Sequence, residues 1–414
     1  MKIGIICIGD ELLIGQVIDS NSAQIGLLLS EISLTVFRKW TVSDSCEEIN
    51  YALQSSVTDC DLTIISGGLG PTKDDITKKA LANYFKVSLV FSEQNYQHLY
   101  NLLSARNIEV QEAHKVQCMV PSNADLLNNK LGTAMGLWME KDNRIFIALP
   151  GVPDEMNAIM KEEVLPRLKL LSTNEITSHR TFLTVGYGET DIAYRIEPVL
   201  NEMPEFIKVA YLPAIAQVRL RLSGTHKDKN VLNETLDFYS NQIRNLLGSI
   251  IFGESDSNLA FELGKLLMNR GMKVGTVESC TGGALAAKFT SNPGSSAYFK
   301  AGLVTYATES KESLLNISTQ LIEEKGVVSD EVVRSMVIEG SRFLKVDLAI
   351  ATSGIAGPDG GTLQNPVGTV YIACGNEHNQ IFKRLSLSRN RTRNIEAATI
   401  LALSLARDWL LARS

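Results

Sequence analysis

Short apolar runs alternate with amphipathic segments along the first 170 residues of the chain. The run 2–8 is continuously aliphatic, as expected for a strand that is buried on both faces of a parallel sheet. The strands that the pattern predicts are 2–8, 34–42, 61–66 and 144–149. Apolar residues at helical spacing follow these runs and predict helices that include 74–85 and 154–170. This alternation is typical of a doubly wound α/β domain, which we assign to residues 1–170.

The pattern changes twice after residue 170. A polar, linker-like stretch over 171–179 is followed by two short strands and an amphipathic helix, which predict a small α+β module over residues 171–250. Strand–helix alternation then returns and predicts a second α/β domain over residues 251–414. Its predicted strands are 273–277, 302–306, 347–352, 367–374 and 380–387, followed by a terminal helix over 393–411.

Composition narrows the classes of protein that fit this pattern. The chain has 414 residues, of which 44% are hydrophobic and 21% charged, a balance typical of a soluble globular protein with two or three domains. A net charge of −6 argues against a broad nucleic-acid-binding face. The six cysteines form no C-x-x-C pair, and no stretch approaches the roughly 20 apolar residues that span a bilayer. We therefore expect a reduced, cytoplasmic protein that binds neither nucleic acid nor membrane.

Polar residues follow two predicted strands of the first domain at their carboxyl ends, where ligands bind in open α/β sheets. Glycine N–H groups and a helix start near residue 74 favour an anion such as phosphate, whereas neighbouring aspartates favour a divalent cation that bridges phosphate oxygens. A glycine turn with acidic helix capping explains the same residues. The candidates are Asn21, Gly67, Gly68, Gly70 and Thr72 for substrate and Asp10, Glu11, Asp74 and Asp75 for metal.

The last domain places a serine, a thiol and a threonine at a predicted strand-to-helix junction, Glu278–Gly283. A second hydroxyl-bearing turn contains Ser296, and Tyr306 with Lys311 supplies a phenol and an amine. Because the only histidine of this domain is His378, in a polar turn, a serine–lysine arrangement is the natural substitute for a Ser-His-Asp triad. The alternative is that the hydroxyls cap a helix and that the lysine is solvated.

Three arginines alternate just before the terminal helix. In an extended segment, Arg389, Arg391 and Arg393 would lie on one side, an arrangement suited to bidentate phosphate binding. A solvated surface run is the alternative.

The polar segments of the first domain resemble those of the molybdopterin-binding-like domain of the CinA family. The segments that carry the resemblance are Ile8–Leu13, Asp19-Ser20-Asn21, Ser66–Asp75 and Leu149–Met156. The family usually has threonine where this chain has Ile8. The resemblance implies a three-layer α/β domain that hydrolyses ADP-ribose to AMP and ribose 5-phosphate with a divalent metal ion. The alternative for this domain is a non-catalytic pterin- or nucleotide-binding or regulatory module.

The last domain is similar to the C-terminal domain of the same family, and 171–250 to its small KH-like module. The matching segments are Glu278–Gly283, Gly294-Ser295-Ser296, Tyr306–Lys311, Gly326–Ser329, Ser353–Gly361, Asn365–Val370 and Arg389–Arg393. The resemblance implies a CinA-type amidohydrolase that needs no cofactor. It would convert nicotinamide mononucleotide (NMN) to nicotinic acid mononucleotide and ammonia.

In this interpretation, Ser279 or Ser296 is the nucleophile, Lys311 takes its proton, and Tyr306 orients the lysine or relays protons. Gly282 and Gly283 are candidate oxyanion donors. The other candidate substrate contacts are Cys280, Thr281, Gly357, Arg389 and Arg391. We expect small-molecule substrates, NMN and ADP-ribose, and a homodimer.

Overall fold

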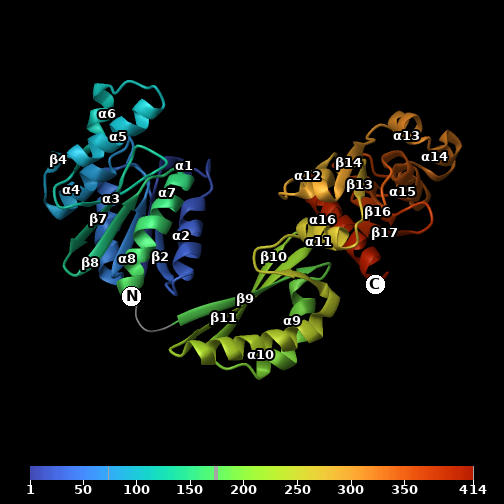
Figure 1. The fold of residues 1–414 in the computed structure, drawn as a ribbon, viewed down its shortest axis with the longest axis horizontal. Coiled ribbons are helices and arrows are strands. Elements are labelled where there is room, and N and C mark those ends of the chain that lie inside the picture. Colours follow the sequence, from blue (N-terminus) through green and yellow to red (C-terminus); the bar gives the residue numbers. More distant parts are fainter. Residues whose placement is uncertain (73, 172–175, 414) are drawn as a thin grey trace. The chain divides into compact units, whose positions relative to one another are not determined.

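The computed structural model describes residues 1–72, 74–171 and 176–413, which form two compact units (Figure 1). One unit consists of Met1–Ser178 with Thr225–Leu232, and the other of His179–Gly224 with Asn233–Ser414. The second unit therefore contains most of the predicted middle module together with the whole predicted last domain.

The first unit contains a six-stranded sheet in the order β2-β1-β3-β8-β7-β6. Its strands are β1 (Ile3–Ile8), β2 (Val36–Val42), β3 (Leu62–Ser66), β6 (Asp125–Leu127), β7 (Gly136–Lys141) and β8 (Arg144–Leu149). β1 pairs in parallel with β2 and β3, and β3 with β8, whereas β7 and β6 continue the sheet antiparallel. The carboxyl ends of β1, β2, β3 and β8 therefore meet at one edge.

Helices cover both faces of this sheet (Figure 1). The helices are α1 (Asp10–Leu13), α2 (Ser20–Ser30), α3 (Cys46–Asp59), α4 (Thr77–Phe85), α5 (Glu93–Ala105), α6 (Glu112–Val116), α7 (Pro153–Ile159), a π-helical turn (Met160–Val164) and α8 (Leu165–Leu171). One buried cluster joins Ile5 to α2, α7 and α8, and a second joins Ile6 to α3 and α4. Successive residues of β1 thus face opposite cores, which confirms the predicted three-layer α/β domain. A two-stranded sheet, β4 (Leu89–Phe91) with β5 (Met119–Pro121), lies outside the main sheet.

The glycine-rich loop after β3 differs from its prediction. The helix predicted from residue 74 begins at Thr77, because the carboxylate of Asp75 turns back and accepts hydrogen bonds from Gly70 N (2.8 Å), Thr72 N (2.8 Å) and Thr72 Oγ1 (2.6 Å). The positive end of α4 therefore starts one turn later than expected.

The middle module is an α+β structure with the strand order β10-β11-β9-β12. Its elements are β9 (Ile176–Val185), α9 (Glu189–Asn201), β10 (Ile207–Ala214), β11 (Gln217–His226), α10 (Lys229–Leu247), a 3-10 turn (Gly248–Ile250) and β12 (Ile251–Glu254). The prediction of a linker over 171–179 is wrong from Ile176 onward, because β9 already begins there; 172–175 lie outside the described residues. Only the second half of β9, from Phe182, is buried, which explains why its polar first half was not recognised as a strand.

The last domain contains a five-stranded sheet in the order β14-β13-β15-β16-β17. Its strands are β13 (Val274–Glu278), β14 (Phe299–Val304), β15 (Leu348–Gly354), β16 (Thr369–Gly375) and β17 (Gln380–Ser386). Its helices are α11 (Leu259–Asn269), α12 (Ala284–Thr290), a 3-10 turn (Ser295–Ala297), α13 (Thr308–Leu315), α14 (Thr319–Lys325), α15 (Asp330–Leu344) and α16 (Arg391–Leu411). α11, α12 and α16 pack into one core and α15 into another, confirming the predicted α/β class (Figure 1). Among the described residues, no helix is both long and apolar enough to span a membrane.

Candidate active site

Three parallel strands of the last domain end at the same edge of the sheet. Glu278, the last residue of β13, lies opposite Val304 of β14 and Thr352 of β15. The ladder continues for one more residue, since Ser279 N donates to Thr352 O (3.0 Å) and Thr305 N donates to Glu278 O (2.8 Å). This register places Ser279 beside the segment that leads from β14 into α13.

α13 carries Lys311 in its first turns and directs its side chain back toward Ser279. Lys311 is fully buried; its Nζ donates to Ser279 Oγ (3.1 Å) and to Thr305 O (2.6 Å), with Tyr306 O at 3.5 Å. Burial lowers the pKa of Lys311 from its ordinary value of 10.5. No carboxylate in the described part of the chain forms an ion pair with Lys311 that would offset this lowering of its pKa. The serine and lysine predicted to work together are thus in contact.

The residue before Ser279 is a buried carboxylate that the sequence interpretation did not single out. Glu278 is fully buried and accepts hydrogen bonds from Thr281 Oγ1 (2.7 Å) and from the N–H groups of Gly283 (3.0 Å), Leu285 (3.0 Å) and Ala286 (2.8 Å). These donors include the first turn of α12, whose positive end stabilises the carboxylate. Glu278 therefore fixes the Ser279 loop to α12.

This arrangement corrects the assignment of Gly282 and Gly283 as oxyanion donors. Gly283 N is taken by Glu278, and Gly282 N donates to Ser279 O (3.1 Å). Within the described residues, the N–H groups of Cys280 and Thr281 do not donate to the backbone of any other residue. The Cys280 thiol is buried, and burial raises its pKa to about 12, so it is not a thiolate at neutral pH.

Ser296 lies at the other end of the strands. It belongs to the 3-10 turn that precedes β14, where Val274 N donates to Tyr298 O (2.8 Å). Because β13 and β14 are parallel, this turn is separated from Ser279 by the length of a strand, roughly 20 Å for six residues. Ser296 is therefore out of reach of Lys311 in the same chain, which corrects its assignment as an alternative nucleophile.

The arginine cluster lies at the start of α16, not in an extended segment. Arg391 is the first residue of the helix and Arg393 the third, so they do not share one side with Arg389 as predicted. Arg391 donates through Nη1 to Gly357 O (2.9 Å) and through Nη2 to Tyr306 Oη (2.9 Å). Both partners are neutral, so Arg391 keeps an uncompensated charge beside the edge that carries Ser279.

The first domain brings Asn21 to the carboxyl edge of its own sheet. Asn21 Nδ2 donates to Ser66 Oγ (2.9 Å) and Gly151 O (2.8 Å), while its buried Oδ1 has no partner among the described residues. It lines a cavity of about 140 Å³ that Gly67 also borders.

The glycine loop presents fewer free donors than expected. Gly67 (φ +112°) passes so close to β1 that a Cβ would lie 2.5 Å from Ile8 O, which explains the glycine. Gly68 also has a positive φ. However, Gly67 N donates to Leu149 O (3.0 Å), and the N–H groups of Gly70 and Thr72 are bound by Asp75. Those three N–H groups are therefore not available to an anion, in contrast to the prediction.

Acidic residues gather beside this cavity, together with one that the sequence interpretation missed. Asp44 follows β2 at the same sheet edge; its carboxylate accepts from Asp10 N (3.0 Å), and Asp44 N approaches Asp10 Oδ1 at 3.4 Å. Burial and the charges of Asp10, Glu11 and Asp74 raise the pKa of Asp44. The signal for Asp44 was its position just past a predicted strand.

The carboxylates do not form a ready-made cage for a metal ion. Asp75, predicted as a ligand, uses both oxygens within its own loop. In the part of the chain that the structure describes, no three His, Cys, Asp or Glu residues converge to hold an ion. The paired Asp10 and Asp44 instead suit Mg²⁺, which is bound typically through one or two carboxylates and through substrate phosphates.

These features define a multidomain α/β protein whose last domain carries a buried serine–lysine pair at the carboxyl edge of its sheet. Residues 4–170 match the family described as "Probable molybdopterin binding domain", 179–253 match "Damage-inducible protein CinA KH domain", and 256–410 match "CinA C-terminal domain". The chain belongs to the CinA family, as its motifs predicted.

Relatives match over the full length of the chain. A CinA-like protein of Flavobacterium psychrophilum is 40% identical over 98% of this chain and 97% of its own, and one of Geobacter sulfurreducens is 38% identical over 100% and 99%. Among solved structures, the competence damage-inducible protein A of Klebsiella pneumoniae is 32% identical over 36% of this chain and 94% of its own, with a TM-score of 0.36.

Proposed function

We propose that the last domain hydrolyses the carboxamide of nicotinamide mononucleotide to the acid and ammonia. The observation that carries this proposal is the 3.1 Å contact between Ser279 Oγ and the buried Nζ of Lys311. A serine hydroxyl needs a base within hydrogen-bond reach, and a lysine becomes one when burial favours its neutral form. The family resemblance supplies the identity of the amide.

The reaction proceeds in two steps that use the same pair. Ser279 Oγ attacks the carboxamide carbon while its proton passes to Lys311 Nζ, and the lysine then protonates the leaving nitrogen, which departs as ammonia. A water molecule attacks the resulting ester; its proton passes to Lys311 and then to Ser279 Oγ as the acid is released. Thr305 O, which accepts from Nζ at 2.6 Å, holds the lysine in position throughout.

Two further features support this chemistry. The N–H groups of Cys280 and Thr281, which donate to the backbone of no other described residue, directly follow the nucleophile, a position from which backbone donors stabilise the tetrahedral oxyanion in other serine hydrolases. Arg391, at the start of α16, can exchange its neutral partners for the substrate phosphate, an anion that both the guanidinium and the helix terminus attract.

Product analysis tests the proposal. The purified chain is incubated with NMN, and ammonia and nicotinic acid mononucleotide are quantified together. Equal amounts of the two products, each increasing with enzyme concentration, are expected. No ammonia release from NMN would refute the assignment.

Replacing Arg391 by alanine is expected to raise KM for NMN about 10- to 100-fold and to change kcat less, because a charge-assisted contact to phosphate contributes roughly 1.5–3 kcal/mol to binding of both ground and transition states. Steady-state kinetics measure both constants. Arg384→Ala, an exposed arginine on β17 that binds Gln364 O, is the matched control. A fall in kcat with KM unchanged would contradict a role in phosphate binding.

For the first domain, we propose metal-dependent hydrolysis of ADP-ribose at the edge that carries Asp10, Asp44 and Asn21. The support is that Asp10 and Asp44 bind each other's backbone N–H groups at the sheet edge that also carries the cavity with the unpartnered Asn21 amide oxygen. A divalent ion bound there would neutralise pyrophosphate charge and activate water. Asp10 and Asp44 are the residues placed to hold it, with Glu11 and Asp74 nearby.

Chelation separates the two activities. Treatment with EDTA is expected to abolish ADP-ribose hydrolysis and leave ammonia release from NMN unchanged, because the Ser279–Lys311 site contains no ligand cluster in the described chain. Each activity is assayed before chelation, after it, and after adding Mg²⁺ back. Equal loss of both activities would contradict this division. Absence of ADP-ribose turnover with any divalent metal would favour the non-catalytic binding module.

A further inference from the structure

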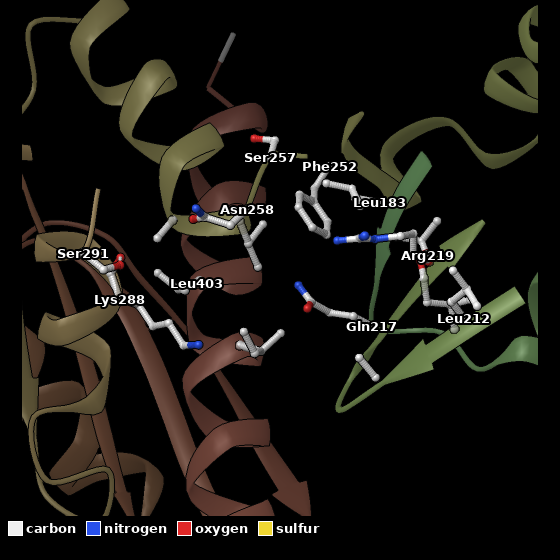
Figure 2. A pocket seen from close by; sticks show the side chains of 16 residues that line it. Leu183, Leu212, Gln217, Arg219, Phe252, Ser257, Asn258, Lys288, Ser291 and Leu403 are labelled. Carbon is white, nitrogen blue, oxygen red and sulfur yellow. Dashed lines mark hydrogen bonds between the residues drawn. The ribbon is translucent and has the colours of Figure 1, made fainter. Parts of the chain in front are cut away.

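A second cavity lies within the second unit, away from the serine–lysine pair. It has a volume of about 480 Å³ and is bordered by the middle module on one side and by α11, α12 and α16 on the other (Figure 2). Its walls are well defined, because Leu183 and Phe252 of the middle module belong to the same buried cluster as Leu259 and Leu403 of the last domain. The volume is within the range of small-molecule sites, roughly 300–1,000 Å³.

Three polar side chains extend into this cavity from opposite walls (Figure 2). Arg219 and Gln217 come from β11, and Lys288 comes from α12. No aspartate or glutamate lines the cavity. Across the residues that the structure describes, none of these three side chains has a hydrogen-bond or ion-pair partner. The cavity is therefore bordered by two positive charges without an acidic partner and by an amide that no other described side chain binds.

Other polar residues of the cavity wall already form hydrogen bonds within the protein. Asn258 caps α11 by accepting from Phe261 N (2.9 Å) and donates to Asn292 Oδ1 (2.8 Å), and Ser257 binds Glu262. These contacts hold α11 and the end of α12 in place. The free polar groups of Gln217, Arg219 and Lys288 have no comparable structural role.

We propose that this cavity binds an organic phosphate of nucleotide size. Arg219 offers a bidentate fork and Lys288 a point charge for the phosphate, which explains two cations without an acidic partner. The Gln217 amide can both donate to and accept from polar atoms in the non-phosphate part of the ligand. The apolar wall formed by Phe252 and Leu403 covers the apolar face of that same part. The site is separate from the proposed catalytic chemistry, since neither Ser279 nor Lys311 lines it.

Calorimetric titration of the full chain with AMP tests this assignment. AMP also resembles the ligands of the two proposed active sites. Binding at the cavity is therefore identified as the part of the AMP titration that the cavity variants lose. Arg219→Ala and Lys288→Ala are each expected to weaken that step about 10- to 100-fold, the effect of losing one charge-assisted hydrogen bond. Ala214→Trp, an exposed wall position, should abolish it by filling the cavity without changing charge. Lys265→Ala, an exposed lysine paired with Glu262 outside the lining, and Arg391→Ala should leave it unchanged.

Two further ligands test the chemistry of the site. Adenosine should bind much more weakly than AMP because it has no phosphate. Inorganic phosphate should also bind weakly because it lacks the nucleoside that would contact the apolar wall. Binding of AMP that all three cavity variants retain, the absence of any AMP step, or equal affinity for adenosine and AMP would overturn the proposal.

Discussion

Replacing Lys311 by methionine is expected to lower kcat for NMN deamidation by a factor on the order of 10² to 10⁴, the usual contribution of a general base. Methionine keeps most of the volume of the buried side chain but cannot accept the proton of Ser279. Lys311→Arg should be as inactive, because a guanidinium does not deprotonate in proteins. Ammonia release under saturating NMN measures the effect.

Lys311→Met is also expected to change how the free energy of unfolding depends on pH. This change distinguishes loss of the catalytic base from damage to the fold. Burial lowers the pKa of Lys311 in the folded chain below its ordinary value of 10.5, so the unfolded chain binds more protons between these two pKa values. The wild-type free energy of unfolding therefore gains a contribution as pH rises through that window and loses it as pH falls. Lys311→Met should lack this contribution and remain folded at neutral pH.

Lys300→Met is the matched control for both measurements. Lys300 also donates to a backbone carbonyl, that of Lys345 (3.0 Å), but it is exposed on β14. Its activity and pH profile should match those of the wild type. Turnover of Lys311→Arg near the wild-type rate would exclude the lysine as the base and redirect attention to Tyr306.

Ser279→Ala is expected to reduce deamidation by a factor on the order of 10³ or more, as removal of a catalytic nucleophile does in other serine hydrolases. The contact to be lost is the hydrogen bond with Lys311, and alanine fits the same nearly buried position. Ser296→Ala, at the far end of β14, should retain activity within about twofold. The two variants are compared by ammonia release and by the KM for NMN. An active Ser279→Ala with an inactive Ser296→Ala would reverse the assignment.

Much of the fold could be predicted because its strands are buried on both faces. The run Ile3–Ile8 is buried along its whole length, and hydrophobicity alone indicates such a strand. β9 was missed because its first six residues are only half-buried and, apart from Ile176, polar. The start of α4 was misplaced because side-chain contacts of Asp75, not helix propensity, determine where that helix begins.

Site residues that directly follow strand ends could be predicted from the sequence. Residues whose roles depend on contacts with distant segments could not. Ser279 and Lys311 both lie just past strands that end at one edge, so their proximity follows from a parallel sheet. The choice between Ser279 and Ser296 depends on which end of the strand each occupies. The roles of Glu278 and Asp44 depend on donors supplied by other segments, which no local motif records.

The proposed deamidation requires that Lys311 is neutral enough in the folded protein to take a proton from Ser279. NMR titration of ¹³C-labelled lysine side chains measures this directly, and the Lys311 signal is identified as the one missing from Lys311→Met. A Lys311 midpoint below 10.5, coinciding with the pH at which kcat/KM for NMN rises, is expected. A Lys311 midpoint at or above 10.5 would contradict it.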